Sequence, residues 1–471
     1  MSATSSLLSR FAALLLVLAL AAASAPALAE DKKDAKPPPP NLEPTAEMKP
    51  DVAARYREAV KAFEKARDAD EDSIARMEAA IKDLKAVEKA APRFAPPLYY
   101  LGIAYQITAE FEKARGVLKR ALDVNPKFHE AMVELGDTYL WLKQPEKAIA
   151  EYERALATKA DYAPAYRQRA FWRMTEKGDF KAALDDATKG LTLDPEDKGL
   201  EALREMAERE VEGPGWARTF VCETEHYRIS TPVSQEFADE LGKHAELIHR
   251  LYTKIFPKID KMKRKFPIVV YADRAEYRKN GGPEGAGGHY SPMIRKLELF
   301  RYGKADDTYL VLYHEGMHQF LHEYLEDAPQ WFDEGLGDFF GPSRYVFEEK
   351  KGKIVSEGME IRPNPWRLEL IQASIRRGQV RPWRQLMLMS HRELYNPQWI
   401  SIHYAQSWSI IYFLCQYGAD QGDRKYFVLL QNYFKALRRG EGQESAFESA
   451  FGKVDMPKLE QEWKDFILKL R

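Results

Sequence analysis

The chain has little of several features that would point to a class of protein. Only two of its 471 residues are cysteine, so at most one internal disulfide can form. Its formal net charge of −1 gives no indication of a nucleic-acid partner or an anionic membrane surface. Beyond the first 29 residues, no stretch comes near the length of about eighteen apolar residues that a membrane-spanning helix needs. We therefore expect a globular chain without nucleic acid and without membrane insertion.

The first 29 residues differ in kind from the rest. Arg10 precedes the apolar run FAALLLVLAL, and small residues follow up to an A-L-A end at position 29. A positive start, a short apolar centre and an A-x-A end are typical of a secretory signal peptide, and no cysteine follows for lipid attachment. We expect residues 1–29 to be cleaved after Ala29 and the mature protein to be secreted or periplasmic. In such a compartment Cys222 and Cys415 could be bridged or could remain buried free thiols.

A Pro-rich segment and a helical repeat follow. Residues 30–50 have the composition of a linker without a core of its own. Helical periodicity dominates residues 51–212, and a third repeat unit has one extra residue in its turn. In the first two complete units, the positions that recur after 34 residues are Gly102, Tyr105, Ala114, Leu118 and Ala121 with Gly136, Tyr139, Ala148, Tyr152 and Ala155.

This repeat resembles the tetratricopeptide repeat, which has the same period. The resemblance implies a solenoid of helical hairpins over residues 51–212, closed by a polar capping helix. It also implies a surface that binds a protein partner. The plain alternative is a helical bundle, which the register of the units disfavours.

A second domain is expected from residue 217 to residue 471. The helical pattern breaks at the Gly-Pro-Gly segment 213–215. The segments RTFVCETEHYRIST, KFPIVVYA and HYSPMIRKLELFRY have strand composition, and an amphipathic helix lies between the first two. The pattern is mostly helical from Asp306 onward, with Asp306 or Asp307 expected as a helix N-cap. A small sheet followed by helices is an α+β arrangement.

The most informative stretch is VLYHEGMHQFLHEYLEDAPQWFDEGLGDFF, residues 311–340. On a helix, His314 and His318 lie one turn apart on one face and can bind one zinc ion together. Glu315 lies beside them, close enough to act as a general base. The stretch therefore predicts a metal site on a helix.

A catalytic zinc needs a third protein ligand and one open position. The segment APQWFDEGLGDFF offers Glu334 on a second helix, where Pro329 suits the first turn. Gly335 and Gly337 would let this helix pack closely against the first. Asp338, one turn after Glu334, could accept a hydrogen bond from a ligand histidine and fix its tautomer.

H-E-x-x-H, followed sixteen residues after its second His by E-x-x-x-D, resembles the gluzincin zinc peptidases. The resemblance implies His314, His318 and Glu334 as zinc ligands, and Glu315 as the general base. The segment HYAQSWSIIYFL resembles the Y-E-K-G element of aminopeptidase N, although Gln and Ser replace its Lys and Gly. That likeness implies Tyr404 as a donor to the oxyanion.

The aminopeptidase G-x-M-E-N motif is absent, so an aminopeptidase is not implied. Residues 217–471 are also similar to secreted bacterial proteins of unknown function with a peptidase-MA-like domain. The expected fold is thus an N-terminal α-solenoid followed by a gluzincin-type domain.

The sequence predicts a secreted or periplasmic metallopeptidase with Zn²⁺ as cofactor and a peptide or protein as substrate. The repeats would bind a protein partner or the substrate itself. Two alternatives remain open. One is an envelope scaffold whose zinc is structural or vestigial, and the other is a zinc hydrolase of another amide bond, for instance in cell-wall peptide.

Several further residues of this half are expected to be structural. His322 continues the histidine stripe but lies roughly 12 Å from His314 along the helix axis, so one ion cannot use both. Asp333 is expected to be solvated. Three histidines could help to bind an oxyanion but are expected to have structural roles, namely His289, His391 and His403.

Overall fold

The computed structural model describes residues 42–44, 48–68, 73–256, 265–325, 327–350, 353–419 and 422–471. The expected signal peptide and most of the expected linker lie outside these residues. The described chain divides into two compact units on either side of the Gly213–Pro214 bond. Among the described residues, no helix combines the length and the hydropathy needed to cross a bilayer.

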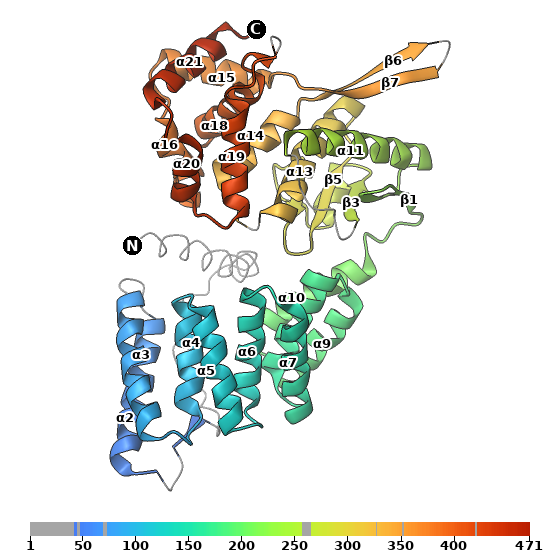
Figure 1. Ribbon diagram of the computed structural model, residues 1–471. Coiled ribbons are helices and arrows are strands. Elements are labelled where there is room, and N and C mark those ends of the chain that lie inside the picture. The colour runs from blue at the N-terminus through green and yellow to red at the C-terminus, as the bar shows by residue number, and fades with distance from the viewer. Residues whose placement is uncertain are drawn as a thin grey trace. The chain divides into compact units, whose positions relative to one another are not determined.

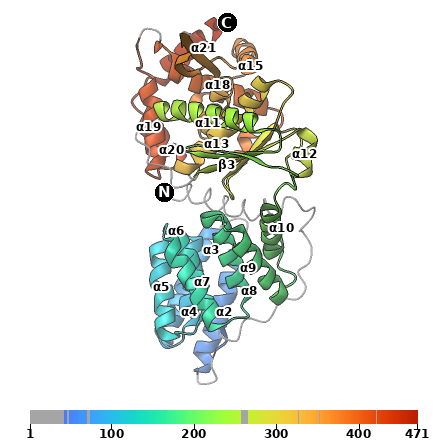
Figure 2. The same cartoon turned by 90° about the vertical axis from the view of Figure 1, so that its right-hand side faces the viewer.

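The first unit is a row of antiparallel helices, coloured blue to green in Figure 1 and Figure 2. Each successive pair forms a hairpin, and the last helix follows the final pair. The helices are α2 (Pro50–Arg67), α3 (Ser73–Ala90), α4 (Pro96–Ile107), α5 (Phe111–Val124), α6 (His129–Trp141), α7 (Pro145–Thr158), α8 (Ala163–Trp172), α9 (Phe180–Leu193) and α10 (Lys198–Glu212).

The recurring glycines explain why the hairpins close so tightly. A Cβ atom at Gly102 would lie 2.5 Å from the side chain of Leu118, and one at Gly136 would lie 2.4 Å from the ring of Tyr152. Each pair joins the two helices of one hairpin, so a larger side chain in place of glycine would push them apart. The extra residue of the third unit is absorbed by a π-helical turn, η2 (Arg173–Lys177), which continues α8.

The second unit begins with a five-stranded mixed sheet of strand order β1-β2-β3-β5-β4. The β2–β3 and β3–β5 pairs are parallel, whereas β1–β2 and β4–β5 are antiparallel. Strand β4 therefore forms one edge of this sheet. The strands are β1 (Phe220–Glu223), β2 (Tyr227–Thr231), β3 (Phe266–Tyr271), β4 (Gly288–Ser291) and β5 (Lys296–Phe300).

Helices cover both faces of the sheet, as the alternation of side chains along β3 shows. Ile268 and Val270 point into the main core, where α11 (Gln235–Ile255) and α13 (Ala305–Tyr324) pack. Tyr271 points to the opposite face and packs with Tyr277 of the short helix α12 (Arg274–Lys279). The sheet thus packs against α13, the helix that carries the H-E-x-x-H motif, and holds it in place.

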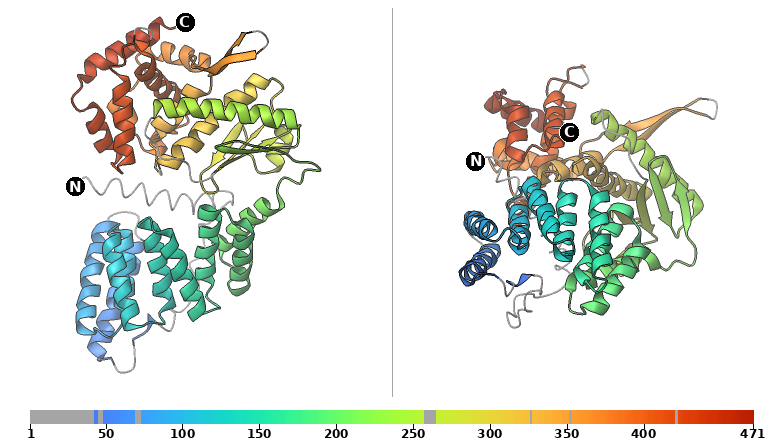
Figure 3. Two further views of the ribbon diagram at one scale, coloured as in Figure 1. Left: turned by 45° about the vertical axis from the view of Figure 1, so that its right-hand side comes forward. Right: turned by 60° about the horizontal axis from the view of Figure 1, so that its bottom comes forward.

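The rest of the second unit is helical apart from one hairpin. Strands β6 (Arg344–Lys350) and β7 (Lys353–Glu360) form a separate two-stranded sheet that extends outward from this unit (Figure 1, Figure 3). The helices are α14 (Gln330–Phe340), α15 (Pro365–Arg376), α16 (Trp383–Met387), α17 (His391–Leu394), α18 (Ile400–Gln416), α19 (Phe427–Arg438), α20 (Gln443–Phe451) and α21 (Met456–Lys469).

One local detail differs from the sequence expectations, and one open question is decided. The N-cap of α13 is Lys304, without a side-chain cap, while Asp306 and Asp307 lie within the first turn. There they favour the helix through its dipole rather than by capping. Both cysteines, Cys222 and Cys415, are free thiols, which decides between the two states left open by the sequence.

Limited proteolysis should separate the two units at residues 213–215. Gly213 and Gly215 both have positive φ angles, 64° and 68°, and lie outside any helix or strand. The indole nitrogen of Trp216 donates to Glu276 over 2.8 Å, which ties the start of the second unit to its own core. A broad-specificity protease should therefore leave a stable fragment that begins near Trp216. Cuts scattered evenly through both halves would contradict this boundary.

The second unit should lose stability in mild acid because of His249 in α11. Its side chain is 4% exposed and stacks on His226 at 4.0 Å between ring centroids. Burial, assisted by the charge of His226 and opposed by Glu246, lowers the pKa of His249 to about 4. Above the ordinary histidine pKa, neutral His249 costs the folded state no stability. As the pH falls from about 6.5 towards 4, the free energy of unfolding decreases, because only the unfolded state takes up the proton.

The expected loss between pH 7 and pH 5 is on the order of 2 kcal/mol. Chemical denaturation at both pH values measures it, and His249→Phe should flatten the dependence by about that amount. The exposed His391 offers a control, since His391→Gln should leave the dependence unchanged. An equal pH dependence in wild type and His249→Phe would show that His249 is not responsible.

Candidate metal centre

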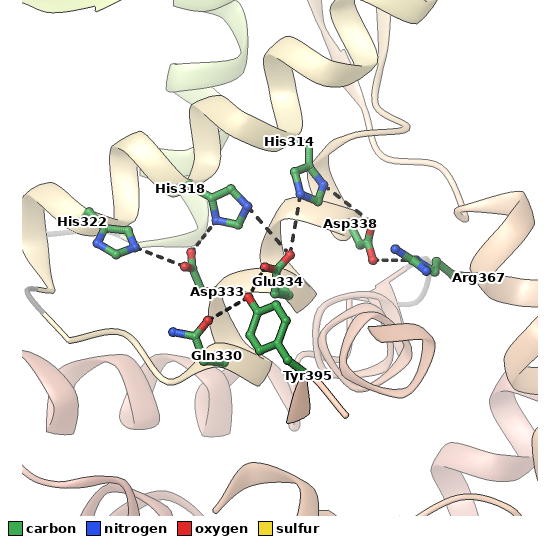
Figure 4. Close-up of polar contacts among 9 residues, drawn as sticks. All are labelled: His314, His318, His322, Gln330, Asp333, Glu334, Asp338, Arg367 and Tyr395. Atoms are coloured by element: carbon green, nitrogen blue, oxygen red, sulfur yellow. Dashed lines mark hydrogen bonds and ion pairs between the residues drawn. The ribbon is translucent and has the colours of Figure 1, made fainter. Parts of the chain in front are cut away.

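Two packed helices carry the predicted ligands. Helix α13 presents His314 and His318, and helix α14 presents Glu334 (Figure 4). A Cβ atom at Gly337 would lie 2.8 Å from the ring of His314, so this glycine lets α14 approach the histidine directly. Gly335, which the sequence suggested for the same contact, instead faces α18, where a Cβ would lie 2.9 Å from the backbone of Ser407.

The three side chains converge on one point. The Nε2 atoms of His314 and His318 lie 3.8 and 3.9 Å from Oε2 of Glu334. One donor atom from each residue lies within 4.8 Å of the other two. Donor atoms at the corners of a zinc tetrahedron are roughly 3.4 Å apart, so small side-chain movements would suffice to bind an ion. No other group of three such side chains occurs in the described part of the chain.

Asp333 supports His318 from behind, contrary to the expectation that it is solvated. Its side chain is 9% exposed, Oδ1 lies 2.6 Å from Nδ1 of His318, and Oδ2 lies 3.1 Å from Nε2 of His322. Successive residues on a helix point in directions about 100° apart. Asp333 can therefore contact Nδ1 of His318 while Glu334 faces Nε2 of the same ring. His322 is thus a partner of Asp333 and not a ligand.

This arrangement sets the charge of the two histidines. Burial works against the charged form of His318, but Asp333 outweighs it and raises its pKa to about 10. Burial and the neighbouring His318 lower the pKa of His314 to about 4. At neutral pH these values leave His314 neutral and give His318 the positive charge that faces Asp333. A metal ion bound through His318 would have to displace that proton, so its affinity should rise with pH.

Asp338 lies on the Nδ1 side of His314, but without the hydrogen bond that the sequence suggested. Its Oδ1 lies 3.6 Å from Nδ1 of His314, beyond hydrogen-bond range, while Oδ2 accepts from Nε of Arg367 at 2.7 Å. The guanidinium carbon of Arg367 also lies 5.1 Å from the centre of the Tyr404 ring. Arg367, from α15, therefore links the surroundings of His314 to Tyr404 and was not found from the sequence.

Glu315 lies beside the ligands without belonging to them. Its side chain, on α13, is half-buried. Its carboxylate accepts a hydrogen bond from the backbone of Tyr290 in the edge strand β4. Burial raises the pKa of Glu315 to about 7; the charge of His318 opposes this shift, and Glu334 and Asp333 add to it. A carboxylate with this pKa can take up and release a proton near neutral pH, as a general base requires.

Two tyrosines lie close to Glu334. Tyr404 of α18 is half-buried, and burial followed by the charge of Glu334 raises its pKa well above the usual range. Tyr395, just after α17, places its hydroxyl 2.7 Å from Oε1 of Glu334 and 2.9 Å from Oε1 of Gln330. The sequence pattern singled out Tyr404 only. Tyr395 belongs to no recognisable motif, and only the fold brings it to Glu334.

The remaining candidate histidines lie outside this centre. His289 contacts the hydroxyl of Tyr277 at 2.9 Å, and Nδ1 of His403 bonds the carbonyl of Leu394 at 2.9 Å. His391 is exposed and stacks on the ring of Tyr395. None of the three contributes a donor to the convergent set.

Two family models match the chain. Residues 310–428 match a family described as a protein of unknown function, DUF1570, and this match contains the whole centre from His314 to Tyr404. Residues 109–169 match the tetratricopeptide repeat family, so the first unit contains tetratricopeptide repeats. No curated protein matches the chain.

Solved structures similar to part of the chain include two tetratricopeptide proteins and MamA. The first repeat domain of Spaghetti (RPAP3), bound to an HSP90 peptide, is 19% identical over 25% of this chain and 94% of its own, with a TM-score of 0.24. A thermophilic repeat protein of Thermus thermophilus is 22% identical over 33% and 88%, with a TM-score of 0.28. MamA of Desulfovibrio magneticus is 18% identical over 35% and 93%, with a TM-score of 0.28.

Proposed function

We propose that this protein is a zinc-dependent metallopeptidase of the gluzincin type. The observation that carries the proposal is the convergence of His314, His318 and Glu334, with Glu315 beside them on the same helix. Two imidazole nitrogens and one carboxylate oxygen suit zinc, and three protein donors leave one position for a substrate. Asp333 keeps Nε2 of His318 directed at this site through its bond to Nδ1.

The roles of the surrounding residues follow from their positions. A zinc ion bound there would polarise a substrate carbonyl and lower the pKa of a water molecule. Glu315 would take the proton from the attacking water and pass it to the leaving amine. Tyr404 would donate a hydrogen bond to the oxyanion that develops on the carbonyl. The cluster of Asp338 and Arg367 would keep both His314 and Tyr404 in place.

The edge strand β4 favours an extended peptide as substrate. It lies at the border of the sheet, and the backbone of Tyr290 already reaches Glu315. A peptide that added to this edge as a further strand would run past the general base, with main-chain hydrogen bonds giving affinity independent of sequence. The position of β4 therefore favours peptide hydrolysis over the hydrolysis of a compact small molecule.

A scaffold with a structural zinc is the second candidate. It explains the tetratricopeptide repeats, which support protein–protein interaction. It does not explain Glu315, because a structural site usually has four protein ligands and needs no base. Asp333 and Asp338 face the Nδ1 sides of the histidines, where they cannot supply the fourth donor. A peptidase that binds a protein partner or its substrate through the repeats accounts for both halves.

Digestion of a mixed peptide library tests the proposal. Zinc-loaded protein should release new peptide ends, a chelator should stop their appearance, and added zinc should restore it. The residues around each cleavage would also give the side-chain preference. Protein that binds one zinc but cuts nothing in a broad library would contradict the peptidase and favour the scaffold. Cleavage that persists in excess chelator would contradict the metal mechanism.

A further inference from the structure

Glu334 has two oxygen atoms, and the structure gives them different surroundings. Oε2 faces the two Nε2 atoms of His314 and His318. Oε1 lies 2.7 Å from the hydroxyl of Tyr395, a distance typical of a hydrogen bond to a charged acceptor. Figure 4 shows Tyr395 on the side of Glu334 away from the histidines. One oxygen is thus directed at the metal position, and the other is held by a neutral donor.

Tyr395 is itself anchored on several sides. Its hydroxyl also lies 2.9 Å from the side-chain oxygen of Gln330, one turn before Glu334 on α14. The two oxygens compete for one proton, and the contact with the charged Glu334 is the shorter, at 2.7 Å. Its ring stacks on His391 at 4.3 Å and meets the edge of the Tyr404 ring at 6.0 Å. A capping box formed by two preceding residues fixes the short helix α17, which ends just before Tyr395. These contacts hold the Tyr395 ring, and with it the hydroxyl, in one position.

From these contacts we propose that Tyr395 is a positioning residue that makes Glu334 bind the metal through Oε2 alone. The inference rests on the metal site of the proposed function. A carboxylate can bind a metal through one oxygen or through both, and the second oxygen would fill the position that a catalytic zinc leaves open. The hydroxyl of Tyr395 holds Oε1 away from the metal, so the site keeps that position for substrate.

Cobalt(II) binding to the full chain tests the inference, because the visible absorption of cobalt(II) reports its coordination number. Wild type should give the strong absorption of a four-coordinate site. Tyr395→Phe removes the hydroxyl that contacts Oε1 and keeps the ring, so Oε1 loses this contact and can turn towards the metal. We expect weaker, shifted absorption and an affinity for cobalt(II) about 10- to 100-fold lower, the range seen when an outer contact to a ligand is lost.

Tyr412→Phe is the matched control. Tyr412 lies in α18 of the same unit, is buried, and packs on Phe339 and Trp408 away from Glu334. This variant should keep the wild-type spectrum and affinity. Should Tyr395→Phe fail to fold, Gln330→Leu removes the oxygen that competes with Glu334 for the Tyr395 proton. This variant should keep the four-coordinate spectrum, and a shift towards higher coordination would overturn the inference.

The outcomes separate this inference from the proposed function. Wild type that binds no cobalt(II) or zinc would overturn both. Wild type that binds cobalt(II), with an identical spectrum and affinity in Tyr395→Phe, would overturn the role of Tyr395 and leave the metal site intact. A changed spectrum in Tyr395→Phe together with an unchanged one in Tyr412→Phe is the result that supports the inference.

Discussion

Glu315→Gln should lower the rate of peptide hydrolysis by at least about 100-fold while zinc stays bound. The amide keeps the size of the carboxylate but cannot accept the proton of the attacking water. Glu315 is not one of the three convergent donors, so its replacement should leave the zinc content near one per chain. Turnover of a peptide found by library digestion, measured together with metal content by mass spectrometry, gives both quantities for one preparation.

Asp307→Asn provides the control for this variant. Asp307 is exposed in the first turn of the same helix α13, so the change replaces a carboxylate by an amide without reaching the metal centre. It should retain full activity. A Glu315→Gln protein with wild-type activity would exclude Glu315 as the general base. Loss of zinc from Glu315→Gln would mean that Glu315 is a ligand, and the assignment of donors would have to change.

His318→Ala should abolish stable zinc binding. It removes one of three donors and also takes from Asp333, buried at 9% side-chain exposure, its partner His318, which leaves the contact with His322. The loss of affinity should exceed the roughly 10- to 100-fold that follows removal of an outer contact to a ligand. Competition with a chromophoric chelator would measure the dissociation constants of wild type and variant.

His226→Ala is the corresponding control. His226 lies in the same unit but pairs with Glu246 at 2.8 Å, outside the metal centre. Its zinc affinity should equal that of wild type. Equal affinities in wild type and His318→Ala would remove His318 from the ligand set. A collapse of binding in His226→Ala as well would show that loss of folding, and not loss of a donor, explains the effect.

Those parts of the fold with a strict local period could be predicted from the sequence. The offset of 34 residues aligned Gly102 and Leu118 of one repeat with Gly136 and Tyr152 of the next, and the structure shows the same close contact in both repeats. The spacing of four in α13 likewise put His314 and His318 on one face. In both cases the geometry of a single helix or hairpin determines which residues meet.

The parts that depend on packing between distant segments could not be predicted. An aspartate at the start of a helix is usually solvated, and only the orientation of α14 against α13 turns Asp333 into the partner of His318 and His322. Tyr395 and Arg367 reach the centre from the end of α17 and from α15, after connections whose course no sequence period fixes. Gly335 was assigned to the wrong neighbour for the same reason, since α18 packs on the other side of α14.

The most direct measurement is the X-ray absorption spectrum of the zinc-loaded protein at the zinc edge, with and without a small hydroxamate. The account predicts two imidazole nitrogens and one carboxylate oxygen from the protein, no sulfur, and one further ligand that the hydroxamate replaces. Four protein donors, or a spectrum that the hydroxamate leaves unchanged, would show a closed site. Such a site would contradict the proposal that His314, His318 and Glu334 keep one zinc position open for a peptide substrate.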